Sequence, residues 1–141
     1  MVDDRSVEAR SRGMSAVRNK NTIPEVKVRR ILHRMGYRFR LHVRDLPGNP
    51  DVVLPRHKMC IFVHGCFWHQ HSNCSRATLP SSNTEFWRAK FEKNRIRDQA
   101  VQRELEQLGW RVCVIWTCFL SREVELAEML VKCIEGGSVQ N

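Results

Sequence analysis

The sequence predicts a single α/β domain in which helices flank a mixed central sheet. The chain has 141 residues, enough for one hydrophobic core and too few for two. Its apolar and turn-forming residues indicate a helix, three strands, a second helix, a fourth strand and a last helix. This order is typical of layered α/β proteins. We expect a basic arm at 1–20, the folded domain at 21–135 and a tail at 136–141.

The first helix is expected to begin after Thr22 and to end at Gly36. Thr22 is a suitable N-cap, Pro24 lies in the first turn, and Glu25 stands where it completes a capping box. From this spacing alone, a structural role is favoured for Glu25. The apolar residues that follow recur at the spacing of one helical face, and they are Val28, Ile31, Leu32 and Met35.

Four segments have the patterns of strands. In 37–43, aromatic or apolar residues alternate with arginines. Residues 51–54 and 59–63 flank the turn-forming segment 55–58, and together they indicate a hairpin. The segment 111–116 is a short continuous apolar run, which suits a strand buried on both faces.

The two remaining helices are long and amphipathic. One is expected from about Thr84 to Leu108, closed by Gly109, and the other from Ser121 to about Ile134. Between the hairpin and the first of these helices, residues 65–82 are polar and carry cysteines and histidines. We expect that segment to be irregular.

The charge of the chain indicates a polyanionic partner. Lysine and arginine number 24 against 15 acidic residues, so the formal net charge is +9. Nucleic acid fits this charge, but a basic, solvated surface would give it equally well, and other evidence is needed. No apolar run is long enough to span a bilayer, and the N-terminal residues contain no secretory signal, so we expect a cytosolic protein without membrane contact. In that compartment the six cysteines are expected to be metal ligands or buried thiols.

Cysteine and histidine residues predict a zinc site. Cys66, His71 and Cys74 lie within nine residues of one another, in a segment without core character. Structural zinc takes four ligands in a tetrahedron, and Cys118 is the best candidate for the fourth because it follows the 111–116 strand. Spacing alone leaves His69 as an alternative to His71. The other cysteines are expected to be buried thiols: Cys60, Cys113 and Cys133.

The predicted hairpin also brings chemically useful side chains together. Its turn places Asp51 opposite residues 62–64, close to His64 and beside the loop that carries His69. A carboxylate for magnesium and imidazoles for proton transfer could hydrolyse a phosphodiester. The alternatives are that Asp51 is a cap or turn residue and that the two histidines are additional zinc ligands. The pattern alone leaves these alternatives open.

Several motifs resemble the very-short-patch repair (Vsr) endonucleases. The strongest are Leu46-Pro47-Gly48-Asn49-Pro50-Asp51 and the run from Ile61 to His71, which contains His64-Gly65-Cys66-Phe67-Trp68-His69. The resemblance extends from about Arg12 to Cys118. It includes Lys20-Asn21-Thr22-x-Pro24-Glu25, Phe86-Trp87-x-x-Lys90, Asn94-x-x-Arg97-Asp98 and Gly109-Trp110-Arg111-Val112.

The resemblance implies a restriction-endonuclease-like fold with a zinc-stabilised loop. It also implies a magnesium-dependent enzyme that nicks one DNA strand at T:G mismatches, which arise when 5-methylcytosine is deaminated, and so starts very short patch repair. The substrate would be double-stranded DNA, and downstream mismatch-repair proteins would be partners. No strong heptad pattern suggests a dimer, and nicking of one strand fits a monomer, so we expect a monomer. The expected location is the bacterial cytoplasm, in association with the nucleoid.

The resemblance assigns roles to particular residues. It implies that Asp51 and the main-chain carbonyl of Val63 bind magnesium, that His69 is the acid-base histidine, and that His64 supports the site. Glu25 would act through bound water, in addition to capping its helix. For zinc, the family pattern selects His71 over His69, and the implied ligands are Cys66, His71, Cys74 and Cys118.

DNA contacts are expected from aromatic and polar residues. Phe67 and Trp68, held in the zinc loop, could insert into the base stack and kink the duplex, at a cost that is smaller at a weakened wobble pair. The resemblance adds Trp87 as a third wedge residue. Lys90 and Asn94, one turn apart on a helix, would contact bases or phosphates near the mismatch, and Met14 would enter the opposite groove.

Two departures from the family pattern stand near the site. Val63 replaces a hydroxyl residue of some relatives, which leaves a main-chain carbonyl ligand possible. Thr117 precedes Cys118 where the family often has glutamate. Two other functions remain open: a zinc-stabilised DNA-binding module without catalysis, and a restriction-type nuclease with another target.

Overall fold

The computed structural model describes residues 22–136, which form a small mixed α/β domain. The predicted basic arm, with Met14, and nearly all of the predicted tail lie outside the described residues. The regular elements, in chain order, are α2 (Ile23–Arg34), β1 (Val52–Leu54), η1 (Pro55–His57), β2 (Met59–His64), α3 (Thr84–Gln107), β3 (Arg111–Trp116), η2 (Thr117–Phe119) and α4 (Glu123–Glu135).

The sheet has three strands in the order β1-β2-β3 and is mixed, as predicted. β1 and β2 are antiparallel, with Val52 opposite Ile61, and β2 and β3 are parallel, with His64 opposite Trp116. The hairpin turn is the short helix η1, followed by Lys58 in a left-handed conformation (φ 53°). The parallel pairing brings the ends of β2 and β3 to the same edge of the sheet.

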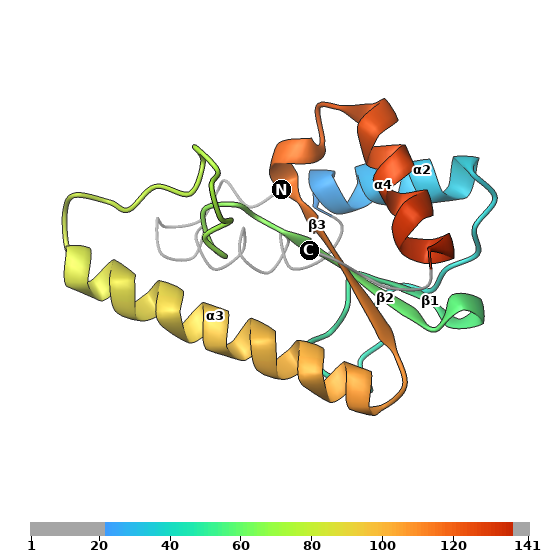
Figure 1. Ribbon diagram of the computed structural model, residues 1–141, viewed down its shortest axis with the longest axis horizontal. Coiled ribbons are helices and arrows are strands. Elements are labelled where there is room, and N and C mark those ends of the chain that lie inside the picture. Colours follow the sequence, from blue (N-terminus) through green and yellow to red (C-terminus); the bar gives the residue numbers. More distant parts are fainter. Residues whose placement is uncertain (1–21, 137–141) are drawn as a thin grey trace, which may run out of the picture.

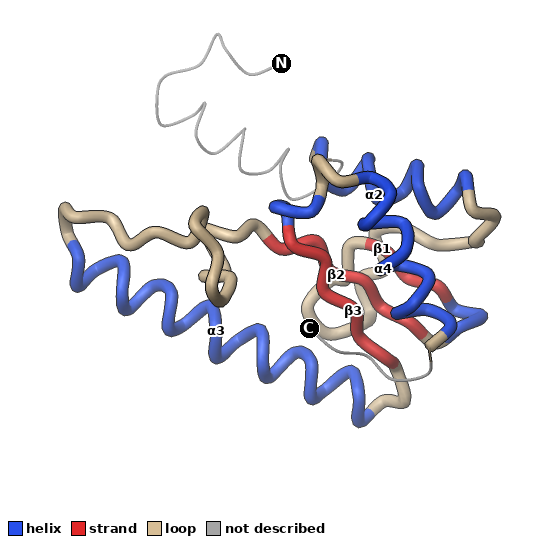
Figure 2. Tube along the Cα trace, turned by 45° about the horizontal axis from the view of Figure 1, so that its top comes forward, coloured by secondary structure: helices blue, strands red, loops and turns tan. Residues whose placement is uncertain are grey.

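Helices cover both faces of the sheet. Helices α2 and α4 lie on one face and α3 runs along the other (Figures 1 and 2). Alternate residues of β2 and β3 therefore enter two different cores. Ile61 and Ile115 pack with α2 and α4, whereas Cys60 and Val112 pack with Leu105 of α3. This double coverage explains why β3 is an apolar run without alternation.

The strand predicted at 37–43 is wrong. Within it, only Arg40 pairs with the sheet, through two hydrogen bonds with Val53 of 2.7 and 3.0 Å. The alternating pattern reflects partial burial, because Tyr37 and Phe39 pack against the α2–α4 core. His42 has a left-handed backbone (φ 58°), which turns the chain away from the sheet and stops further pairing.

The helix predictions are confirmed to within about two residues at each end. The predicted N-cap is present: the Glu25 N–H donates to Thr22 Oγ1 over 3.3 Å. Cys60, Cys113 and Cys133 are buried thiols, as expected. Between residues 22 and 136, no helix combines the length and the apolar character needed to cross a membrane.

Gly48 allows the loop that precedes β1 to pack closely against α3. Its φ is +76°, and a Cβ atom there would lie 2.4 Å from Cγ1 of Val101. Only glycine fits both the backbone conformation and the close contact. The Leu46-Pro47-Gly48 loop is thereby packed against α3, three residues before Asp51.

Candidate active site and metal centre

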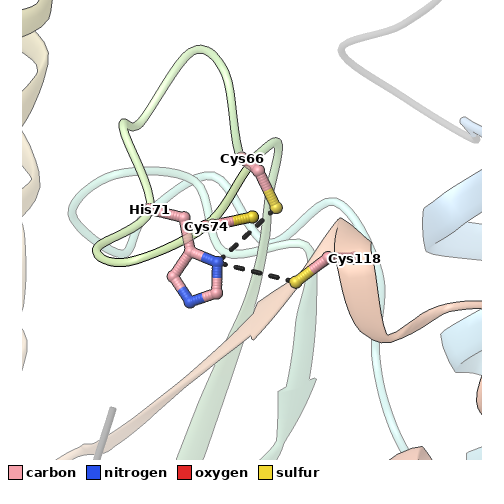
Figure 3. A group of neighbouring side chains, drawn as sticks. All are labelled: Cys66, His71, Cys74 and Cys118. Carbon is pink, nitrogen blue, oxygen red and sulfur yellow. Dashed lines mark hydrogen bonds between the residues drawn. The ribbon is translucent and has the colours of Figure 1, made fainter. Parts of the chain in front are cut away.

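Four side chains converge in the arrangement expected of a metal site. Cys66, His71 and Cys74 come from the loop after β2, and Cys118 comes from η2 just beyond β3 (Figure 3). Their ligand atoms all lie within 4.8 Å of one another. Nδ1 of His71 is 3.7 Å from Sγ of Cys66 and 3.5 Å from Sγ of Cys118. This cluster could hold a metal ion, and it joins the loop to the far end of β3.

Thr117 forms hydrogen bonds with one member of this cluster, Cys66. The Cys66 N–H donates to Thr117 Oγ1 over 3.3 Å, and that hydroxyl lies 3.5 Å from Cys66 Sγ, to which it donates. Although burial raises the pKa of the Cys66 thiol, hydrogen bonds from Thr117 and Cys118 hold it below its ordinary value. The hydroxyl therefore favours the thiolate form, which is the form that binds metals.

Two carboxylates meet where β1 begins. The Val63 N–H donates to Asp51 Oδ2 over 2.6 Å, and Asp51 also interacts directly with the Glu25 carboxylate of α2. Burial raises the pKa of Asp51 to about 7; the Val63 hydrogen bond opposes this increase, and the charge of Glu25 adds to it. Glu25 is only 6% exposed. Two adjacent carboxylates withdrawn from water are costly to ionise together, and a bound cation would remove that cost.

His64 at the end of β2 stacks on His69 of the loop that follows. The rings of His64 and His69 are 3.8 Å apart and nearly parallel, at 3°. Nδ1 of His69 lies 2.6 Å from Oδ2 of Asp98 on α3. Burial lowers the pKa of His64 to about 4, and His69 adds to the decrease, so His64 is neutral at physiological pH.

Asp98 determines which nitrogen of His69 is available. Burial raises the pKa of Asp98, but the hydrogen bond from His69 lowers it, and the pKa lies below its ordinary value. Asp98 is therefore an ionised acceptor, and Nδ1 of His69 carries the donated proton. In neutral His69 this leaves the Nε2 lone pair free to accept a proton.

An aromatic surface borders the same loop. Phe67 packs edge-on against Phe91 of α3 (ring centroids 5.2 Å apart), and Trp68 lies 5.8 Å from Trp87. Phe91 is buried, but Trp68 is 49% exposed and Phe86 is 61% exposed. The loop aromatics are thus anchored on α3, while large ring surfaces of the cluster remain in contact with solvent. A cluster of exposed aromatic side chains is typical of a binding surface.

Asn94 connects the loop to α3. It is only 7% exposed; Nδ2 donates to the Trp68 carbonyl over 3.0 Å, and Oδ1 accepts from Arg97 over 3.0 Å. Lys90, one turn earlier, is exposed. Lys90 and Asn94, which were predicted together to contact DNA, therefore differ in exposure: Lys90 lies at the surface and Asn94 is buried.

The motifs and geometry agree with the comparisons with known proteins. Residues 2–76 match the family model described as DNA mismatch endonuclease Vsr. The chain is also 38% identical over 147 residues to the DNA mismatch endonuclease Vsr of Escherichia coli, covering 99% of this chain and 94% of that protein. The chain belongs to the Vsr family of DNA mismatch endonucleases.

Other relatives of this Vsr-family chain are nicking enzymes. It is 52% identical over 121 residues to the type II nicking enzyme V.XorIIP of Xanthomonas oryzae, covering 86% of this chain and 88% of that protein. It is 41% identical over 130 residues to the type II nicking enzyme V.NmeAIP of Neisseria meningitidis, covering 92% of each. All three relatives are matched over most of their length, so the site lies within the shared region.

The Vsr-family chain brings most of the predicted site residues into two adjacent groups. The first is the metal cluster, which contains His71 rather than His69. The second joins Asp51 and Glu25 to the strand end that carries Val63 and His64. Met14, predicted to contact DNA, lies outside the described residues.

Sequence reasoning gave no role to Asp98, which holds His69, or to Trp116, which contacts a member of each group. Asp98 follows Asn94 by four residues, so the helical spacing could have placed both on the face that meets the loop. The Trp116 ring stacks on His71, 4.1 Å away, and lies edge-on to His64, 5.4 Å away. No sequence signal distinguishes this tryptophan from an ordinary core residue at a strand end.

Proposed function

We propose that this Vsr-family protein is a magnesium-dependent endonuclease that nicks the T strand of duplex DNA at T:G mismatches and so starts very short patch repair. The observation that carries the proposal is the Asp51–Glu25 pair beside the stacked histidines, with His69 bonded to Asp98. A DNA-binding module would need none of these groups as a set. The description of the E. coli relative as a mismatch endonuclease, and of others as nicking enzymes, supports the reaction class.

The wider proposal follows the family. It comprises a restriction-endonuclease-like fold, a basic arm at 1–20 followed by the nuclease domain at 21–135, action as a monomer, and recruitment of mismatch-repair proteins after nicking. The proposed location is the bacterial cytoplasm, at the nucleoid.

The donor set fits magnesium. Asp51 and, through water, Glu25 offer the hard oxygen ligands that this ion prefers, and we assign the main-chain carbonyl of Val63 as a further ligand. The Val63 N–H fixes one oxygen of Asp51, which orients the carboxylate. When bound, magnesium would polarise the scissile phosphate and stabilise the charge that develops on it.

The histidines have distinct proposed roles. His69 accepts a proton at Nε2 from the attacking water as the new bond to phosphorus forms and the ester bond to the leaving oxygen breaks. The leaving oxygen takes the electron pair of the broken bond and is protonated by a solvent water molecule. Asp98 holds the ring of His69 and stabilises the imidazolium that results. His64, kept neutral, supports the stacked ring without adding a competing positive charge.

The four-residue cluster fits zinc. With Zn–S bonds of about 2.3 Å and a Zn–N bond of about 2.05 Å, tetrahedral geometry separates sulfur and nitrogen by about 3.6 Å. The separations between His71 Nδ1 and the sulfurs of Cys66 and Cys118 are 3.7 and 3.5 Å. Zinc bound to Cys66 and His71 would hold both ends of the segment 66–71, which contains His69.

Thr117→Val is expected to lower zinc affinity by about tenfold, because groups bonded to metal ligands orient them and tune their charge. The substitution removes the hydroxyl that bonds both the amide and the sulfur of Cys66. Competition with a chromogenic chelator measures the change. Thr78→Val, at an exposed position of the same loop, is the control. Unchanged affinity in Thr117→Val would show that the hydroxyl does not tune the site.

The aromatic surface is proposed to open the mismatched base step. Trp68 and Phe67 would insert as wedges, with Trp87 alongside, at a cost of about a few kcal/mol that is lower at a wobble pair. Lys90 is exposed for contact with phosphate or bases. Asn94 would contribute a base contact only after its bond to the Trp68 carbonyl is exchanged, so we propose that wedge insertion and Asn94 binding are linked.

Trp68→Ala is expected to weaken binding to a T:G duplex by about tenfold and binding to the matched duplex much less, since a stacked ring contributes about 1–3 kcal/mol. Fluorescence anisotropy with both duplexes measures the ratio. Leu79→Ala, which removes another exposed apolar side chain of the loop, should leave the ratio unchanged. Equal losses on the two duplexes would refute the wedge role.

Single-turnover nicking of end-labelled duplexes tests the proposed function. The duplexes carry T:G, T:C or T:A at one position within varied flanking sequences, with magnesium or a chelator. We expect cleavage of the T strand at T:G only, and only with magnesium. Cleavage regardless of mismatch would indicate a restriction-type nuclease, and tight binding without a nick under any metal would indicate a non-catalytic module.

A further inference from the structure

Arg29 lies one helical turn after Glu25 on α2 and is turned towards the candidate active site. Its Nη2 atom is 3.2 Å from Oε1 of Glu25, and the two side chains are 14% and 8% exposed. Among residues 22–136, the other ion pairs of α2 join Lys27 and Arg34 to Glu123 at the surface. Exposed pairs of that kind contribute little, whereas a pair withdrawn from water interacts strongly.

The charge of Arg29 also acts on Asp51. It attracts the Asp51 carboxylate, which the neighbouring Glu25 carboxylate repels. Helix α2 thus presents an acidic and a basic side chain together, at the i and i+4 positions of one face, to the carboxylate at the start of β1. When all three groups are ionised, Arg29 offsets one of the two negative charges of Asp51 and Glu25.

We propose that Arg29 is a positioning residue of this site: it fixes the Glu25 carboxylate beside Asp51 and offsets part of the negative charge of the two carboxylates. The inference rests on the proposed nuclease function. Arg29 acts through Glu25 and makes no contact with DNA. Its ion pair restricts the rotamers of a side chain that must orient bound water, and its charge moderates the attraction of the site for a divalent cation.

These two effects act in opposite directions when the guanidinium is removed. Without the ion pair, Glu25 is less well oriented, so turnover falls. Without the positive charge, a divalent cation is repelled less, so it binds more tightly. Arg29→Gln is therefore expected to lower single-turnover nicking at saturating metal by about tenfold. It is expected to lower the dissociation constant for Mn²⁺, measured by electron paramagnetic resonance without DNA, by about threefold.

Two matched variants separate this role from a loss of folding. Arg30→Gln, at the next and exposed position of α2, should leave both quantities unchanged. Arg29→Lys keeps the charge, so the Mn²⁺ dissociation constant should stay near its original value while nicking recovers in part. A destabilised fold would weaken metal binding and nicking together, and weaker Mn²⁺ binding in Arg29→Gln would overturn the proposal.

A double-mutant cycle tests whether Arg29 acts through Glu25. If it does, Glu25→Gln/Arg29→Gln nicks no more slowly than Glu25→Gln alone. Independent losses that multiply would overturn the proposal and point to direct contact between Arg29 and DNA. If the unmodified protein does not nick any duplex, the proposed function fails, while the Mn²⁺ comparison still decides whether Arg29 moderates the charge of the site.

Discussion

Asp51→Asn is expected to lower the single-turnover rate of T-strand nicking by about a thousandfold or more, because a metal ion that stabilises developing charge contributes several kcal/mol. The asparagine side chain keeps an oxygen that can accept the Val63 N–H, so the loop should retain its position. What is lost is the negative charge next to Glu25. Gel analysis of labelled duplexes at a fixed, saturating magnesium concentration measures the rate.

The same variant should bind mismatched DNA as well as the original protein or slightly better, since a negative charge has been removed near the phosphates. Asp45→Asn, at an exposed position of the preceding loop, is the matched control and should nick at the original rate. Nicking by Asp51→Asn at more than about a tenth of the original rate would contradict a role as the metal ligand.

Cys118→Ser is expected to remove zinc and, with it, most of the nicking activity. Cys118 lies beyond β3 and is far in sequence from His69, and the metal cluster links it to the loop that carries this histidine. Without the fourth ligand, the loop that carries Phe67, Trp68 and His69 loses the metal link to the sheet edge, where the hydrogen bond between Cys66 and Thr117 remains. We also expect the free energy of unfolding to fall by about 3 kcal/mol, because a structural metal binds only the folded state.

Metal analysis of the purified protein, thermal unfolding and the nicking assay measure these effects together. About one zinc per chain is expected in the original protein and close to none in Cys118→Ser or Cys66→Ser. Cys133→Ala removes a buried thiol of α4 that is outside the cluster, so it should keep its zinc. Full zinc content in both serine variants would exclude the assigned ligands.

Local patterns in the sequence predicted most of the elements. The capping residue Thr22 and the turn at 55–58 act through neighbours in the chain, so their structures could be inferred without knowledge of the fold. The apolar run of β3 indicated a strand because it suits burial on both faces, which the helices on the two sides of the sheet provide. The exception was 37–43, where alternation predicted a strand. Alternating burial requires only an apolar surface beneath the chain, whereas a strand also needs partners for its backbone, and the left-handed residue His42 prevents them.

The sequence by itself determined which chemical groups the site contains. The hairpin symmetry placed Asp51 near the end of β2, and the three ligands clustered after it required one more from elsewhere. The position of Cys118 just past a strand made it the best candidate for the fourth ligand. The parallel register of β2 and β3 explains why Cys118 lies near the other three side chains, because His64 opposite Trp116 puts the residues after both strands at one edge of the sheet.

Only the tertiary structure decided how these groups act on one another. Asp98 reaches His69 across 29 positions of sequence, and Arg29 of α2 pairs with Glu25, so that both of these side chains of α2 act electrostatically on Asp51. Such contacts depend on the packing of α3 and α2 against opposite faces of the sheet. That packing is a sum of many weak apolar contacts, which no short motif records. The sequence thus determined the chemistry available to this protein, and the packing of its layers decided the distances and charges under which that chemistry takes place.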